Sequence, residues 1–313
     1  MPFTYDVVIH RTSAIYDRTH LIAAYPPVRD PIDIGGNMSV RRLEHGVADR
    51  VARTVSAGGV PNAAQHQYAF VREHNPANDG DFDPGQRLQA AIALSRLVCP
   101  TSIGLEESCQ IEGGIENGDA GGYIRPGPVS GPAAQAWIAN ETARDWLTAD
   151  DALALRELIR RYDVSPPVGR IKRALWYHEY AARTLEGSVR WIIVATGLEA
   201  LLGTDRIGVS KQFVERTVAI AQLLNVEFSR QDSRDSYSLR SKMSHGAFTS
   251  IAPERLALYV RMETLLRMAI KQCIELDDWR AKFQDDASVR AALPVSLNDI
   301  CPKCGREIPL TEA

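Results

Sequence analysis

The chain has 313 residues, enough for one large domain or two of ordinary size. Its hydrophobic content of 45% suffices for a packed core, and the 36 Lys and Arg residues against 39 Asp and Glu exclude a uniformly basic coat, although a local basic patch remains compatible. No apolar run approaches the roughly 18 residues of a membrane span, and we expect no signal peptide. Five Cys residues with one C-x-x-C pair favour a reducing compartment, so we expect a soluble, cytoplasmic protein without membrane contact.

Alternating short apolar runs predict strands in the first part of the chain, at residues 5–10, 20–25 and 67–71. Helical spacing predicts a helix over residues 39–55, with Ser39 as its N-cap. Its apolar stripe consists of Val40, Leu43, Val47, Val51 and Val55. A second amphipathic helix is predicted over 86–98. Residues 1–130 therefore form a predicted N-terminal α+β domain of unknown role.

Glycines and prolines crowd residues 112–132, which indicates a linker and a domain boundary near residue 130. Helical patterns dominate beyond it, and we predict a mainly α protein whose second domain, residues 131–280, is an antiparallel helical bundle. The predicted helices are 148–161, 169–183, 186–202, 209–225, 233–245 and 253–280. Residues 281–313 are a predicted short tail.

The helix predicted over 186–202 is apolar on nearly every side, so it should occupy the centre of the bundle. Thr196 and Glu199 are its only polar side chains between Trp191 and Leu202. A carboxylate on such a helix needs a partner or loses its charge. Two interpretations follow: Glu199 pairs with a neighbouring Arg for structural reasons, or it lines a site and orients Arg240 or His245.

Arg240 and His245 lie in the segment Tyr237-Ser-Leu-Arg-Ser-Lys-Met-Ser-His-Gly246, near the end of a predicted helix. An arginine can hold a phosphate while a histidine moves a proton, the combination that metal-free RNA cleavage needs. Five positions correspond to about 140° around an ideal helix, so the two side chains do not face one point. A site would need either a distorted helix end or two motifs meeting across a symmetric dimer.

The pattern Leu198-Glu-Ala-Leu-Leu202, followed by Leu239-Arg-Ser-x-x-x-His-Gly246 and a long closing helix, resembles the HEPN superfamily, in particular its Apea-like branch from prokaryotic defence systems. The resemblance covers residues 165–280 approximately. It implies a helical bundle that forms a homodimer and, in many members, a metal-independent endoribonuclease. Arg240 and His245 would be catalytic with Glu199 beside them, and Ser241 and Lys242 would contact the substrate.

The resemblance implies attack of a ribose 2′-OH on the adjacent phosphorus, with His245 as general acid or base and Arg240 stabilising the phosphoryl charge. No cofactor is required for that reaction. The implied partner is RNA, in antiviral defence or a toxin-like stress response, with a regulatory protein or phage trigger acting through the N-terminal domain. The alternative is a catalytically silent HEPN module that binds RNA or a partner protein.

Cys301 and Cys304 form a C-P-x-C-G knuckle near the end of the chain. Such a turn presents two thiolates to one zinc, but a structural site needs four ligands and no second pair follows. The interpretation stays open between a zinc shared by two tails, a vestigial ribbon, a free thiol pair and a disulfide.

Overall fold

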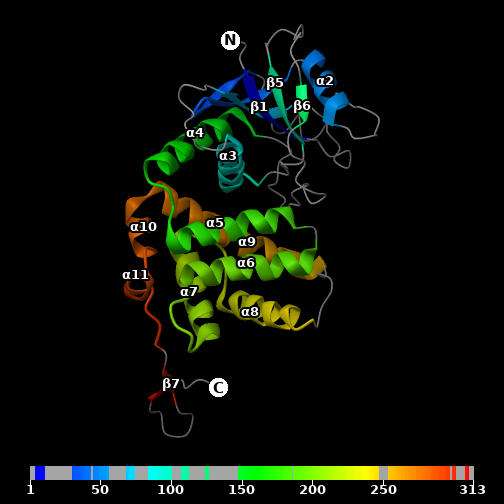
Figure 1. Cartoon of the computed structure of the whole chain (residues 1–313). Coiled ribbons are helices and arrows are strands. Elements are labelled where there is room, and N and C mark those ends of the chain that lie inside the picture. Colours follow the sequence, from blue (N-terminus) through cyan, green and yellow to red (C-terminus); the bar gives the residue numbers. More distant parts are fainter. Residues whose placement is uncertain are drawn as a thin grey trace. The chain divides into compact units, whose positions relative to one another are not determined.

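Figure 1 shows the computed structural model of the chain. It describes residues 4–10, 30–43, 45–55, 68–74, 84–100, 107–112, 124–126, 147–184, 186–246, 253–296, 298–300 and 307–309. The chain divides into two compact units, Met1–Val164 and Ser165–Ala313. Most described residues are helical, which confirms a mainly α protein. Within those ranges, no helix combines the length and the apolarity that crossing a bilayer requires.

The first unit contains an antiparallel sheet with the strand order β2-β3-β4-β1-β5-β6. The strands are β1 (Thr4–His10), β2 (Ile32–Gly35), β3 (Met38–Arg42), β4 (Tyr68–His74), β5 (Glu107–Glu112) and β6 (Ile124–Pro126). β1 lies between β4 and β5, with Val7 opposite Val71 on one side and Cys109 on the other. The strands predicted at 5–10 and 67–71 correspond to β1 and β4, whereas the one at 20–25 lies outside the described residues.

Among the described residues of this unit, the helices are α2 (His45–Val55), α3 (Pro84–Val98) and α4 (Ala149–Val164). α4 packs on β2 and on α3, and an Arg87–Asp163 ion pair of 2.7 Å joins α3 to α4. The unit therefore extends to Val164, beyond the boundary predicted near residue 130, because the apolar face of α4 is buried here. The buried residues of α4 include Ala152, Leu155, Leu158 and Ile159.

The helix predicted over 39–55 is wrong in its first part. Met38–Arg42 is strand β3, and the helix begins only at His45. Val40 is completely buried and lies opposite Phe70 of β4, while Ser39, the predicted N-cap, is the second residue of the strand. The alternation of buried Met38 and Val40 with the more exposed Ser39 is the period of a strand. The predicted apolar stripe is therefore divided between strand β3 and helix α2.

The second unit is a helical bundle built around α6 (Gly187–Leu202). Its other helices are α5 (Gly169–Arg183), α7 (Val209–Leu224), α8 (Arg230–Ser244), α9 (Pro253–Glu275), α10 (Asp277–Lys282) and α11 (Asp286–Ala292). α6 packs against α5, α7, α8 and α9, and Trp191, Val194 and Leu198 are completely buried. The predicted central position of this helix is confirmed, and Figure 1 shows it between α5 and α8.

Two buried arginines complete the C-terminal end of α6. Arg170 Nη1 donates to the Leu201 carbonyl at 2.9 Å, and Arg216 Nη1 donates to the Leu202 carbonyl at 2.6 Å. These carbonyls have no partner within the helix, and cations at this end also interact favourably with the helix dipole. The end of α6 that carries Glu199 is therefore held from two sides.

The closing part of the chain differs from the prediction of one helix over 253–280. α9 ends at Glu275 because Leu276 is extended, with φ −122° and ψ 124°. Arg280 Nη2 and Nε donate to the carbonyls of Ile274 and Cys273 at 3.0 and 3.2 Å, which satisfies the helix end. α11 was not predicted, and β7 (Asn298–Ile300) pairs with β8 (Glu307–Pro309) inside the predicted tail.

Candidate active site

Helix α8 positions the Arg240–His245 segment, and the sequence specifies both of its ends. Ser229 is the N-cap: its hydroxyl accepts from the Asp232 N–H at 3.0 Å, and the Asp232 carboxylate accepts from the Ser229 N–H at 2.9 Å. Asp232 also binds Arg261 of α9 at 2.7 Å. His245 is the C-cap, followed by Gly246 at φ 74°, a conformation that favours glycine.

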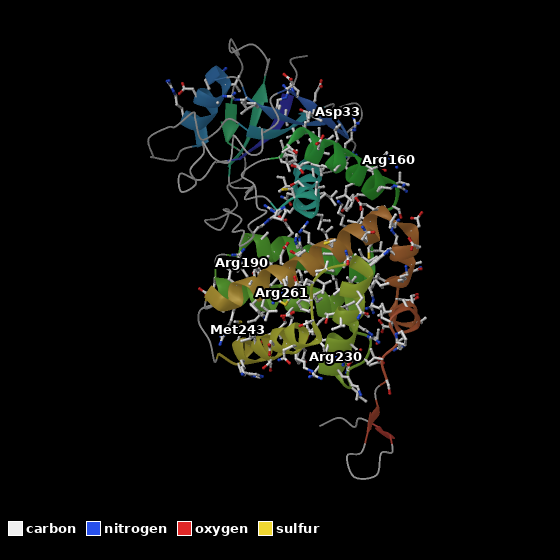
Figure 2. The ribbon with its side chains drawn as sticks, turned by 180° about the vertical axis from the view of Figure 1, so that it is seen from behind. Asp33, Arg160, Arg190, Arg230, Met243 and Arg261 are labelled. Carbon is white, nitrogen blue, oxygen red and sulfur yellow. The ribbon has the colours of Figure 1, made fainter. Side chains whose placement is uncertain are left out.

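One face of α8 is fixed against the bundle. Leu239 and Met243 are buried, and the Trp191 indole of α6 donates to the Ser236 carbonyl at 3.2 Å. Figure 2 labels Arg230 and Met243 at opposite ends of α8, with Arg261 on the neighbouring α9. Since Leu239 and Met243 fix the rotation of the helix, they also fix which side chains of its last turns face α6 and which face solvent.

Arg240 faces α6. Its Nη2 donates to Glu199 Oε2 at 2.8 Å, and the two side chains are 28% and 16% exposed. The guanidinium also lies 5.9 Å from the centre of the Tyr237 ring, one turn earlier on α8. Both interpretations of Glu199 allow an arginine as its partner, and in the structure that partner is Arg240.

The Glu199–Arg240 pair is partly shielded from solvent, and each side chain has a polar atom that is not hydrogen-bonded in the described part of the chain. Glu199 Oε1 and Arg240 Nε are buried, and neither forms a hydrogen bond to the described residues. Burial raises the pKa of the Glu199 carboxyl above its usual value, and the charge and hydrogen bond of Arg240 oppose part of that rise. Burial and the charge of Glu199 likewise raise the pKa of Tyr237. A carboxylate in this setting depends on its arginine to remain ionised.

The other predicted residues lie further along the same helix end. His245 and Lys242 are exposed, and Ser241 is half-buried. His245 donates its backbone N–H to the carbonyls of Ser241 and Lys242, both at 3.2 Å. Within the described residues no hydrogen bond joins Arg240 to His245. The structure thus brings Arg240, Glu199 and Tyr237 together and leaves the His245 side chain open to solvent.

A second polar cluster, not anticipated from the sequence, lies among α5, α6 and α9, where His178 is buried and Glu263 and Arg267 are half-buried. His178 Nε2 lies 2.8 Å from Glu263 Oε1, and Arg267 lies 3.6 Å from the same oxygen. Burial would raise the pKa of Glu263, but His178, Arg267 and Arg190 hold it below its usual value. Burial raises the pKa of Tyr259 to about 12. Charged residues inside the apolar stripes of α5 and α9 were the sequence signal of this cluster. Hydrophobic periodicity does not show, however, which of these residues contact one another.

The two cysteines considered for metal binding, Cys301 and Cys304, both lie outside the described residues. Within the residues that are described, no group of three or more His, Cys, Asp or Glu side chains is arranged to hold a metal ion. Cys99 of the first unit and Cys273 of the second are both buried. The chain matches no protein-family model, no curated protein and no solved structure.

Proposed function

We propose that the second unit is a HEPN-type, metal-independent endoribonuclease whose active site forms when two copies of α8 meet in a homodimer. The observation that carries the proposal is the divergence of two side chains at one helix end. Arg240 is anchored toward α6 by Glu199, while His245 is exposed beyond the helix. A two-fold axis beside this end would place the His245 of one chain near the Arg240 of the other.

In this mechanism each residue has one task. The ribose 2′-oxygen attacks the adjacent phosphorus and the bond from phosphorus to the 5′-oxygen breaks, leaving a 2′,3′-cyclic phosphate and a 5′-OH. His245 of one chain donates the proton that the departing 5′-oxygen needs. The His245 of the other chain, or water, accepts the proton from the 2′-OH. Arg240 stabilises the charge on the non-bridging oxygens.

Glu199 acts in the proposal as a positioning residue. Its bond to Nη2 fixes the plane of the Arg240 guanidinium, and the partly exposed remainder can approach a phosphate. Ser241 and Lys242 follow on the next positions of α8, where the exposed ammonium of Lys242 can add a phosphate contact. The first unit would sense a trigger or restrain the nuclease, and the setting would be phage defence or a toxin-like stress response.

One observation favours a second candidate, a silent HEPN module that binds RNA or a partner protein. Arg240 already has a carboxylate partner at 2.8 Å, which neutralises its charge without any substrate. In that function the pair would only join α8 to α6, and His245 would be an ordinary exposed residue at a helix end.

Incubation with total RNA in excess EDTA separates the two functions. The wild-type chain is expected to cleave RNA, and His245→Ala to cleave about 10²–10⁴-fold more slowly. The matched control is Arg234→Ala, which removes an exposed arginine from the same helix and should cleave at the wild-type rate. Equal cleavage by wild type and His245→Ala would eliminate the nuclease assignment, and no cleavage by either would favour the silent module.

A further inference from the structure

The outer face of α5 carries a row of side chains that the candidate active site does not use. Four of its side chains are exposed, and all are cationic or aromatic: Lys172, Arg173, Trp176 and Tyr180. At 3.6 residues per turn the four positions fall within about 100° of the helix circumference, which places them on one face of the helix. We name this set the α5 stripe.

Two large aromatic rings form the centre of the α5 stripe. Trp176 and Tyr180 are 57% and 49% exposed, whereas aromatic side chains of this size are usually largely covered. Their rings are stacked, with centroids 5.2 Å apart and planes inclined by 15°. Tyr177 meets the indole edge-on at 5.0 Å. Trp176 is thus held in one orientation by its neighbours while much of its surface faces solvent.

The exposed charges on α5 itself are of one sign. Lys172 and Arg173 precede Trp176 by one turn, and no ion pair to either is found in the described part of the chain. The one acidic residue of α5, Glu179, is buried and paired with Arg183 at 2.7 Å. The exposed surface of α5 is therefore positive at one end and aromatic along its middle.

We propose that the α5 stripe binds single-stranded RNA, with bases stacking on Trp176 and Tyr180 and phosphates contacting Lys172 and Arg173. Interleaved aromatic and cationic groups are the combination by which proteins hold single strands without reading their sequence. This proposal rests on the RNA cleavage proposed above, because the strand that the α5 stripe holds would be the substrate. α5 and α8 both pack on α6, so the stripe and the α8 site are carried by the same unit.

The test measures binding of a fluorescein-labelled oligouridylate of about 12 nucleotides to the full chain. The His245→Ala background is used so that the probe is not cut. Trp176→Ala with Tyr180→Ala is expected to weaken binding about 5- to 150-fold for each base that loses its stack. Lys172→Ala with Arg173→Ala should lower the slope of log affinity against log salt by about 1.4. Double-stranded RNA, whose bases are already stacked, should bind at least about tenfold more weakly.

Two matched controls lie elsewhere on the bundle: Leu223→Ala removes an exposed apolar side chain and Arg206→Ala an exposed charge, and both should bind as the parent does. Affinity within about twofold of the parent in the aromatic double variant would overturn the proposal. So would dissociation of a dimer by that variant at unchanged RNA affinity, since the stripe would then be a contact between copies. Binding through the stripe without RNA cleavage by wild type would refute the nuclease alone, while His245-dependent cleavage with unaffected binding would refute only the stripe.

Discussion

Removal of Arg240 should destabilise the second unit in a manner that depends on pH. An exposed ion pair contributes about 0–1 kcal/mol, whereas breaking a fully buried pair costs about 3–5 kcal/mol. The Arg240 and Glu199 side chains are 28% and 16% exposed, and Glu199 Oε1 already has no partner in the described residues. Arg240→Ala should therefore lower the free energy of unfolding near neutral pH by about 1–3 kcal/mol, between those limits.

The pH dependence follows from the direction of the Glu199 shift. Burial raises the pKa of Glu199 in the folded chain, and Arg240 counteracts it. In Arg240→Ala the folded-state pKa rises further above that of the unfolded chain. Between those two values the folded state binds more protons, so the free energy of unfolding decreases as pH increases. The penalty of Arg240→Ala should accordingly be largest near neutral pH and shrink toward about pH 5.

Urea denaturation of wild type and Arg240→Ala at both pH values measures this effect. The matched control is Arg230→Ala at the other end of α8, whose pair with Glu215 is more exposed, at 50% and 29%, and should contribute about 1 kcal/mol or less. Adding Glu199→Gln to Arg240→Ala should recover part of the loss, because an amide costs less to bury than a carboxylate. A penalty below about 0.5 kcal/mol, or one equal at both pH values, would refute the reasoning.

Three further predictions concern the frame of the site. Ser229→Ala removes the N-cap of α8 and should cost about 0.5–2 kcal/mol by thermal or urea denaturation, whereas Ser229→Asp should retain most of the stability. Arg216→Met leaves the Leu202 and Leu293 carbonyls without a buried donor and should cost about 3 kcal/mol or more; a loss below about 1 kcal/mol would contradict that role. Burial raises the pKa of Cys273 to about 12, so its thiol should react with a thiol reagent only as fast as the chain unfolds, and rapid labelling of native protein would be the opposite result.

The sequence predicted the long helices of the bundle more accurately than its breaks and short helices. The helices α5, α6, α7 and α8 are long and strongly patterned, and their predicted bounds agree with the structure within a few residues. α6 could be recognised as central because nearly every position is apolar. The break at Leu276 and the short α11 were not predicted, because Leu276 is extended and side-chain hydrogen bonds from Arg280 of α10 satisfy the end of α9 where local propensity would continue the helix.

The first unit was harder to predict because its sheet depends on pairing between strands that are far apart in the sequence. Val40 fits a helical stripe and a strand equally well, and only its position opposite Phe70 decides between them. At the site, Glu199 could be recognised as a charge on an apolar helix, and Arg240 as part of the Arg-x4-His motif. Their contact required the packing of α8 on α6, and the ring of Tyr237 beside them carried no signal in the sequence.

Mixing two inactive variants tests the two-chain active site most directly. Arg240→Ala supplies His245 and His245→Ala supplies Arg240, so a mixed dimer contains one complete site if the two residues come from different chains. After co-refolding at equal amounts, RNA cleavage in EDTA should return to about a quarter of the wild-type rate, since half of the dimers are mixed and each has one of two sites. Cleavage that stays at the level of the separate variants would contradict a site shared between chains.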